Sequence, residues 1–392
     1  MTKLEQLIQD LCPNGVKMVK LGDVGEFYGG LSGKTKEDFK DGNAKFITYK
    51  NIYANMALEL EVDDKVYVAE GEKQNTVQYG DVLFTGSSET PDECGMSSVL
   101  TTQTDEKLYL NSFCFGWRLY DKSLYLPDFL KHLFRCSAIR KEIGKTASGV
   151  TRFNVSKKKM AELQIPLPPL AVQSEIVRLL DKFTLYKSEL AAELAARCKQ
   201  YEHYRNQLLT FDENTKRVKL GEVAEISRGV RVVKKDLATD GHIPVFQNSM
   251  QPLGYYDKTN TKSNTTFVIS AGAAGEIGFS KVDYWAADDC LRILGNSNVN
   301  DKFIYYWLLN NQKSISSKVR RASIPRLSKD VLVNHPIPLP PLEVQKQIVA
   351  ILDRFDALCN DIKIGLPAEI ELRQKQYEHY RDRLLTFEAK GD

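Results

Sequence analysis

The chain has 392 residues, a length that accommodates two or three domains at roughly 100–200 residues each. Its 54 Lys and Arg against 51 Asp and Glu give a net charge of +3, and 42% of its residues are hydrophobic, which excludes a disordered, collagenous or disulfide-scaffold protein. No apolar stretch approaches the roughly 18 residues of a membrane helix, so we expect no membrane partner.

The N-terminal segment and the cysteines indicate the compartment. Residues 1–10 mix charged residues with leucines at helical spacing and lack the continuous apolar core of a signal peptide. The seven cysteines form no CxxC pair, and their odd number argues against a disulfide framework. The sequence therefore predicts a protein of the reducing cytoplasm.

Residues 1–164 show no continuous helical pattern. Short β-rich runs at 45–49 and 81–84 lie between turn-forming residues, and 126–134 has the pattern of a short helix, so we expect a compact α+β domain. Residues 131–159 hold nine Lys and Arg but one acid, which suits a polyanion such as DNA. The candidate DNA-binding residues of this block are Arg140, Lys145, Ser148, Thr151, Arg152, Asn154 and Lys157.

Residues 165–211 begin with Ile-Pro-Leu-Pro-Pro-Leu and continue as a predicted helix of about 40 residues, roughly 60 Å long. Its apolar positions 172, 176, 179, 183, 186 and 190 step by alternating fours and threes, as in the seam of a coiled coil. The helix contains the tandem repeat Glu-Leu-Ala-Ala at 189–196. Near its end, Tyr201, His203 and Tyr204 are candidates for a subunit interface.

Residues 212–336, like residues 1–164, show no continuous helical pattern. We predict a strand at 266–269 and a helix at 303–310 in this second globular block. Residues 302–329 hold seven Lys and Arg and no acid. A single basic segment is most often only a solvated face, but two at matching places favour a shared polyanion. The candidate DNA-binding residues of this block are Lys318, Arg320, Arg321, Ser323 and Arg326.

Residues 337–392 repeat the first helical block, including a predicted seam at positions 344, 348, 351, 355, 358 and 362. Ile-Pro-Leu-Pro-Pro-Leu returns at an offset of 172, whereas Lys-Gln-Tyr-Glu-His-Tyr-Arg returns at an offset of 176. The four additional residues and the sequence Gly365-Leu366-Pro367-Ala368 predict an interruption of this second helix. The matching interface candidates are Tyr377, His379 and Tyr380. The sequence Lys-Leu-Gly-(Asp/Glu)-Val also occurs twice, at 20–24 in the first globular block and at 219–223 in the second.

No catalytic motif stands out. Residues 29–35 resemble a phosphate-binding loop, but Tyr28 occupies the position where that motif requires glycine. The acidic residues at 92, 105 and 106 with Lys107 fit only a permissive nuclease pattern. The chain has no Asp/Asn-Pro-Pro-aromatic motif for adenine methylation, and its five histidines lack metal-ligand spacing. We therefore expect a binding protein with no catalytic residue, metal or cofactor of its own.

Over its whole length, the chain resembles the specificity subunit of type I restriction–modification enzymes. Three repeated segments carry this resemblance: Ile-Pro-Leu-Pro-Pro-Leu before each helix, Gln-Tyr-Glu-His-Tyr-Arg near the end of each helix, and Lys-Leu-Gly-(Asp/Glu)-Val near the start of each globular domain. The resemblance implies an α+β fold class with a pseudo-twofold internal repeat: two globular α/β target-recognition domains, residues 1–164 and 212–336, separated by two long antiparallel coiled-coil helices, residues 165–211 and 337–392. It also implies that each domain recognises one half of a bipartite double-stranded DNA target, and that the helices fix the spacer. Two methyltransferase subunits and two motor-nuclease subunits would join the chain, and S-adenosylmethionine, ATP and Mg²⁺ would serve those partners.

Two alternatives remain open. One is an enzyme that modifies DNA by itself, and the other is a coiled-coil scaffold with two protein-binding domains. A steep dependence of DNA binding on salt would separate a DNA-recognition protein from a scaffold.

Overall fold

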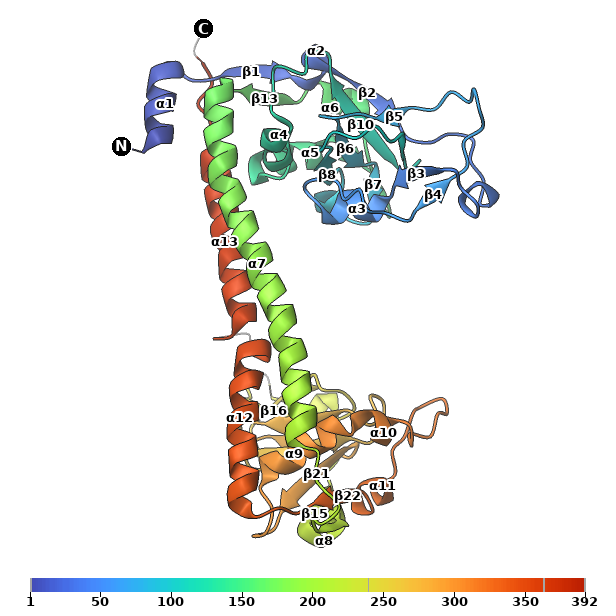
Figure 1. Ribbon diagram of the computed structural model, residues 1–392, viewed down its shortest axis with the longest axis vertical. Helices are drawn as coiled ribbons and strands as arrows, with labels where there is room; N and C mark the ends of the chain where they lie inside the picture. Colours follow the sequence, from blue (N-terminus) through green and yellow to red (C-terminus); the bar gives the residue numbers. More distant parts are fainter. Residues whose placement is uncertain (1, 239, 362–363, 391–392) are drawn as a thin grey trace. The chain divides into compact units, whose positions relative to one another are not determined.

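The computed structural model describes residues 2–238, 240–361 and 364–390. The chain forms two compact units: unit 1 comprises Met1–Glu189 and Ile370–Asp392, and unit 2 comprises Leu190–Glu369. Figure 1 shows that each unit combines a mixed helix-and-strand domain with long helical segments. Within the described residues, no helix has the length and apolar composition needed to cross a membrane.

The domain of unit 1 alternates short strands with short helices, as its β-rich runs predict. Its helices are α1 (Lys3–Leu11), α2 (Leu21–Val24), α3 (Tyr49–Ala54), α4 (Pro127–Leu133), α5 (Ser137–Thr146) and α6 (Lys157–Ala161). Its strands are β1 (Lys17–Lys20), β2 (Gly25–Gly29), β3 (Ala44–Ile47), β4 (Lys65–Val66), β5 (Thr76–Val77), β6 (Val82–Thr85), β7 (Ser87–Ser88), β8 (Ser97–Val99), β9 (Leu108–Leu110), β10 (Cys114–Leu119), β11 (Ala147–Ser148), β12 (Phe153–Val155) and β13 (Gln164–Leu167).

The central sheet of unit 1 is antiparallel and has the strand order β2-β10-β6-β8. Phe84 and Trp117 of this sheet pack against Phe134, which follows α4, and all three side chains are fully buried. The same apolar cluster continues into Val172 and Ile176 of helix α7 (Leu170–Leu208). The domain and the start of the helix therefore share one core.

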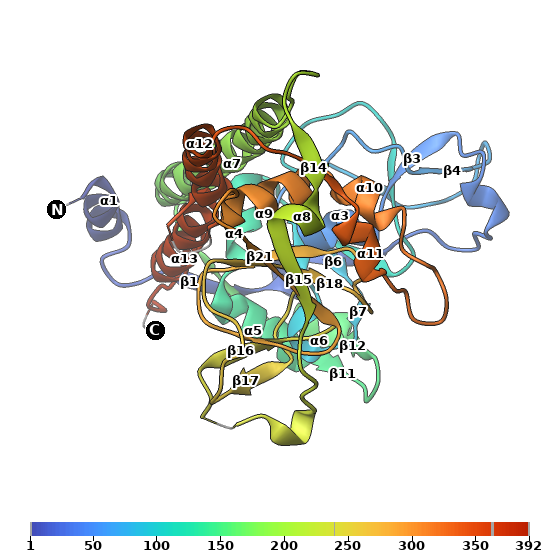
Figure 2. The same cartoon turned by 90° about the horizontal axis from the view of Figure 1, so that it is seen from below.

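Unit 2 repeats this arrangement with a central sheet of strand order β15 (Ala224–Arg228), β21 (Cys290–Gly295), β18 (Thr265–Ile269) and β19 (Ile277–Ser280). Figure 2 shows α9 (Asp301–Asn310) beside this sheet, and Phe303 of α9 shares a core with Ile348 and Leu352 of α12 (Leu342–Asn360). Its strands are β14 (Arg217–Lys219), β15 (Ala224–Arg228), β16 (Ile243–Phe246), β17 (Gly254–Tyr256), β18 (Thr265–Ile269), β19 (Ile277–Ser280), β20 (Trp285–Ala286), β21 (Cys290–Gly295) and β22 (Pro336–Pro338). Its helices are α8 (Leu220–Val223), α9 (Asp301–Asn310), α10 (Gln312–Ser316), α11 (Lys329–Val333) and α12 (Leu342–Asn360), and α13 (Leu366–Leu384) begins at its C-terminal end.

The repeated glycine of the opening motif is required by close packing. A Cβ atom on Gly22 would lie 3.0 Å from the Cβ of Ala161, where α2 crosses α6. A Cβ on Gly221 would lie 2.8 Å from Cγ1 of Val333, where α8 crosses α11. Only glycine allows the two short helices to approach this closely.

A repeated buried glutamine ties each domain to its helix. Gln173 is fully buried, donates to the carbonyls of Pro168 (2.8 Å) and Leu124 (2.9 Å), and accepts from the backbone N–H of Leu126 (2.9 Å). Gln345 donates to the carbonyl of Pro340 (2.8 Å) and accepts from a backbone N–H of the second domain in the same way. Buried side-chain amides are almost always hydrogen-bonded through their donors and acceptor. These hydrogen bonds therefore fix the start of each long helix against its own domain.

The predicted helices are confirmed, including the interruption of the second one. Helix α7 is continuous, whereas α12 ends at Asn360 and α13 begins at Leu366. The two helical segments of unit 1 are antiparallel, because Phe183 stacks on Tyr380 while Lys187, one turn later in α7, donates to Gln374, which precedes Tyr380 in α13.

The predicted seam is only partly correct, and its position 362 lies outside the described residues. Ile348 is buried as expected, but Val344, Ile351 and Leu358 of α12 are between 37% and 40% exposed. These three residues, spaced by seven, form a partly exposed stripe along α12, and Ile351 borders a pocket together with Tyr204 and Leu208 of α7. The seven-residue period alone does not distinguish two apolar faces of one helix.

Candidate nucleic-acid interface

Each domain carries a short hairpin, which is followed by a short helix and then by the strand that precedes the long helix, β13 in unit 1 and β22 in unit 2. In unit 1, which we describe first, β11 pairs with β12 through Ala147 with Val155 and Ser148 with Asn154; we call residues 147–155 hairpin 1. Gly149 has φ +151°, and a Cβ there would lie 2.0 Å from the carbonyl oxygen of Arg152. The tight tip of hairpin 1 therefore requires glycine at this position.

Unit 2 has a corresponding hairpin at residues 320–326, which we call hairpin 2. The paired residues below the tip, which we call the frame of the hairpin, occupy corresponding positions in the two units. The backbone N–H groups of Arg320 and Arg326 each donate to the other residue's carbonyl, at 2.8 and 3.0 Å. Each hairpin is followed by a serine that caps the next short helix, Ser156 for α6 and Ser328 for α11. The offset of 172 residues is kept throughout, so both tips contain five residues, 149–153 and 321–325.

Each hairpin pairs with the segment that directly follows a strand of its central sheet. Asn154 pairs with Ser87 just after β6, and Arg326 pairs with Ala271 just after β18. The frame is thus constant, whereas the five tip residues differ completely between the two domains. This is the arrangement expected of two recognition elements with separate specificities on one scaffold.

The structure leaves most predicted DNA-binding side chains of unit 1 accessible. The exposed residues on or beside hairpin 1 are Lys145, Ser148, Thr151, Arg152, Asn154 and Lys157. Lys145 lies at the end of α5 and pairs with Glu142 at 2.6 Å. The others surround the hairpin or begin α6.

Arg140 is the exception, and the structure assigns it a different role. Its guanidinium is turned inward and donates to the backbone carbonyls of Asp92 and Cys94, both at 2.7 Å, and to that of Gly95. Burial lowers its pKa below the usual value for arginine. We therefore no longer count Arg140 among the candidate DNA-binding residues, because its donors hold the turn at 91–95.

In unit 2 the predicted residues form an exposed basic group on and beside hairpin 2. No ion pair joins any of them to an acidic residue within the part of the chain that the structure describes. Their positive charge is therefore available to a phosphate backbone. These residues are Lys318, Arg320, Arg321, Ser323 and Arg326.

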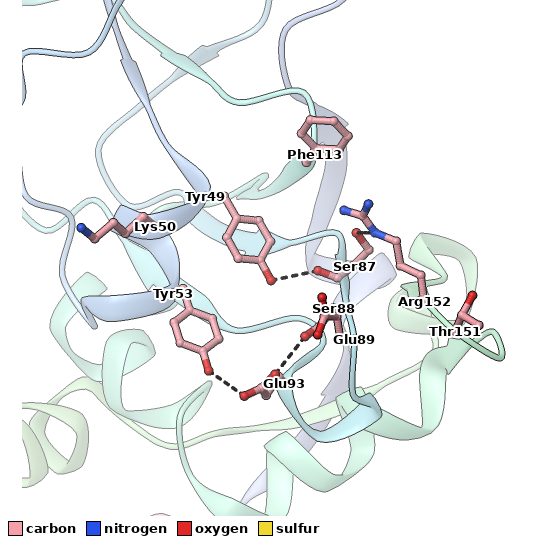
Figure 3. A pocket seen from close by; sticks show the side chains of 10 residues that line it. All are labelled: Tyr49, Lys50, Tyr53, Ser87, Ser88, Glu89, Glu93, Phe113, Thr151 and Arg152. Atoms are coloured by element: carbon pink, nitrogen blue, oxygen red, sulfur yellow. Dashed lines mark hydrogen bonds between the residues drawn. The ribbon is translucent and has the colours of Figure 1, made fainter. Parts of the chain in front are cut away.

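A pocket of about 620 Å³ lies beside hairpin 1, and its residues come from four separate segments of the chain. Figure 3 shows Tyr49 and Tyr53 of α3 on one side, Phe113 above, and Arg152 on the other side. The hydroxyl of Tyr53 donates to Glu93 at 2.9 Å, and hydrogen bonds from Tyr53 and its neighbours lower the pKa of this carboxyl. Sequence reasoning missed the aromatic residues, because no local pattern connects positions so far apart.

The predicted subunit-interface residues divide into two groups. Tyr201 and Tyr377 are only 5% and 4% exposed, and each belongs to the core of its own unit. They therefore stabilise the fold and do not contribute to a surface, which corrects our expectation. The remaining interface candidates are exposed, namely His203, Tyr204, His379 and Tyr380.

The exposed tyrosines lie in matching aromatic pairs. Tyr204 stacks on Phe355 at 5.4 Å in unit 2, and Tyr380 stacks on Phe183 at 5.2 Å in unit 1. Among the described residues, no group of three or more His, Cys, Asp or Glu side chains could hold a metal ion.

Comparisons with known proteins agree with this arrangement. The model of the type I restriction modification DNA specificity domain matches residues 13–200 and again residues 212–372. The EcoR124I/EcoR124II specificity subunit of Escherichia coli is 36% identical over 265 residues, which cover 60% of this chain and 64%, just under two thirds, of that protein. A type I restriction–modification S subunit from M. genitalium has the same fold, with a TM-score of 0.60 at 17% identity over 94% of this chain and 96% of that one. The chain belongs to the family of type I restriction modification DNA specificity domains and contains this domain twice.

Proposed function

We propose that the chain is the non-catalytic DNA-recognition subunit of a type I restriction–modification enzyme, acting in the cytoplasm. Each domain would bind one half of a bipartite target through its hairpin. The observation that carries this proposal is the pair of hairpins that share one bridge position, Ser148 with Asn154 and Arg320 with Arg326, and that differ in their tips and expose basic residues. Phosphate contacts would position each domain, and the tips would contact base edges.

The helices supply a second function under this proposal. The stripe of α12 and the aromatic pair of Tyr204 with Phe355 leave apolar surface partly exposed in unit 2, at a pocket that Ile351 also lines. In unit 1, Val172, the counterpart of Val344, is instead fully buried in the cluster that includes Leu4 of α1. Exposed apolar stripes of this kind mark protein–protein contacts. We assign them to two methyltransferase subunits, with two motor-nuclease subunits joining the complex for cleavage.

The chemistry belongs to those partners. S-adenosylmethionine would serve the methyltransferase subunits, and ATP and Mg²⁺ the motor-nuclease subunits. Purified chain incubated with S-adenosylmethionine and DNA should therefore neither methylate nor cut the DNA. Methyl transfer by the chain alone would instead support the stand-alone enzyme.

Exchange of one domain tests the proposal directly. The complex of the chain with its methyltransferase partner should methylate a bipartite sequence, and replacing residues 212–336 with those of a relative should change one half of it only. DNA binding by the same complex should fall steeply with salt on a log–log plot, as counterion release requires. Binding that is insensitive to salt, with no methylated sequence, would favour the protein scaffold.

A charge on the exposed stripe tests the docking surface. Ile351→Glu places a carboxylate in the stripe and should reduce the number of bound methyltransferase subunits. Ala350→Glu adds the same charge one residue away and serves as the matched control. Equal stoichiometry for both variants, measured by light scattering, would show that the partner docks elsewhere.

A further inference from the structure

The guanidinium of Arg152 is held in place before any ligand is present. Its Nε donates to Oγ of Ser87 at 2.9 Å, and its central carbon lies 5.7 Å from the ring centre of Phe113. Ser87 is itself fixed, because it is 6% exposed and its carbonyl accepts from the hydroxyl of Tyr49 at 2.9 Å. An arginine side chain oriented in this way loses little conformational entropy when it binds.

The two terminal nitrogens of Arg152 have no partner within the described residues. The single hydrogen bond of this side chain uses Nε, and no carboxylate lies within ion-pair distance of the guanidinium in the described part of the chain. Figure 3 shows the guanidinium at the pocket, beside Ser87 and below Phe113. Glu93, on the opposite side, already accepts from Tyr53 and Ser88.

The structure therefore presents two parallel N–H donors at the base of a hairpin tip, on an exposed basic surface. Guanine offers two acceptors, O6 and N7, side by side in the major groove, and arginine pairs with both in the commonest specific contact between proteins and DNA. A phosphate contact needs no such preparation, because a flexible lysine or arginine suffices. Orientation by Ser87 and Phe113 favours a base as the ligand.

We propose that Arg152 recognises a single guanine in the half-site bound by the first domain, and that Ser87 and Phe113 are its positioning residues. This inference rests on the proposed function and specifies the ligand of one residue. The second domain provides an internal contrast. At the same hairpin position, 172 residues later, it has Ile324, which is 53% exposed and offers no donor.

The test uses the assembled complex of the chain with its methyltransferase partner. Methylation mapping first gives the bipartite target, and the half that survives exchange of residues 212–336 belongs to the first domain. Each guanine of that half is then replaced in turn by 7-deazaguanine, which lacks the N7 acceptor. Wild-type binding should weaken about tenfold at one guanine only, since a bidentate pair gives roughly 5- to 150-fold discrimination.

Arg152→Ala should remove this effect. The variant should bind the normal and 7-deaza duplexes equally and accept any base at that position, with the rest of the target unchanged. Ser87→Ala and Phe113→Leu should relax the same position partially. Lys141→Ala removes an exposed lysine of α5 that is not a candidate DNA-binding residue, and it should leave the base preference unchanged. Thermal unfolding would verify that each variant is folded.

Three outcomes would overturn the inference without touching the proposed function. The first half-site contains no guanine, the 7-deaza effect persists in Arg152→Ala, or Arg152→Ala weakens all sequences alike. The last result would identify a phosphate contact. Failure of the proposed function is distinct, because the wild-type complex would then show no sequence preference in either half.

Discussion

Nε2 of His132, a fully buried residue of α4, lies 2.8 Å from Oδ1 of Asp181 in α7. Nδ1 of the same ring lies 2.9 Å from the hydroxyl of Tyr377 in α13. Because a carboxylate can only accept, we assign the imidazole proton to Nε2 and the acceptor role to Nδ1. One neutral histidine thus joins the first domain to both helical segments of unit 1.

In unit 2, a different residue joins the domain to its helix at the corresponding aspartate. Asp353, the counterpart of Asp181, accepts a hydrogen bond of 2.5 Å from the hydroxyl of Tyr306 in α9. Among the described residues, the side chains that contact Asp353 are Tyr306 and Lys302, and neither is a histidine. The two units, similar in fold, therefore differ in how their helix junctions respond to pH.

Acidification should weaken unit 1 through His132. Burial lowers the pKa of His132 in the folded chain. The imidazole therefore becomes protonated near pH 6.5 in the unfolded chain but only at a lower pH in the folded chain. The free energy of unfolding therefore falls as pH drops below about 6.5. His132→Gln keeps a donor and an acceptor but does not titrate, so its melting temperature should fall less between pH 7.5 and 5.5. Exposed His203→Gln is the control, and equal slopes for wild type and His132→Gln would refute this account.

His335→Leu should stabilise unit 2. His335 is 4% exposed, and neither ring nitrogen has a partner within the described residues. Its counterpart in unit 1, at the offset of 172, is the buried Leu163. Removing an unpaired buried polar group should raise the free energy of unfolding by about 1–3 kcal/mol at pH 7.

The gain from His335→Leu should grow at acid pH. Burial, followed by the nearby Lys318, lowers the pKa of His335 to about 4. The unfolded chain is protonated near pH 6.5, so wild-type stability falls by roughly 3 kcal/mol between pH 6.5 and 4, and the variant escapes this loss. The reciprocal change Leu163→His should destabilise unit 1. A lower melting temperature for His335→Leu would mean that the imidazole is paired in solution.

Arg140→Ala should destabilise unit 1 by roughly 2–4 kcal/mol, because three backbone carbonyls lose a charged donor. Its DNA preference, measured on the folded fraction, should remain that of the wild type. Lys145→Ala removes an exposed ion pair and should leave the unfolding midpoint in urea nearly unchanged. Similar midpoints for the two variants would show that the inward contacts of Arg140 contribute little.

The tandem Glu-Leu-Ala-Ala repeat at 189–196 offers a test of the helical spacer. One more unit after Ala196 lengthens α7 by about 6 Å, close to the rise of two base pairs of DNA. If the helices set the distance between the half-sites, methylation mapping should show an unrecognised spacer longer by one or two base pairs, with both half-sites unchanged. An unchanged spacer in an active complex would assign that distance to another element.

The sequence by itself determined the internal repeat, the long helices and the interruption before α13. Repeated segments, helical periodicity and the positions of proline and glycine can all be recognised in the sequence without knowledge of tertiary contacts. The short helices α4 and α9 and the strands β3, β6 and β18 also lie where local patterns predict them. The family resemblance followed from the order of these repeats. The helices and the interruption depend on residues close together in the chain, and the repeat needs only a comparison of two such segments.

Only the tertiary structure decided which residues of a basic segment face solvent. Arg140 and Arg152 belong to the same segment, yet one binds backbone carbonyls of the turn at 91–95 while the other is held by Ser87 and Phe113 at a pocket. Tertiary packing likewise buried Tyr201 and exposed Ile351. The physical reason is that burial and hydrogen bonding depend on partners from distant segments, and the composition of a single segment contains no information about those partners.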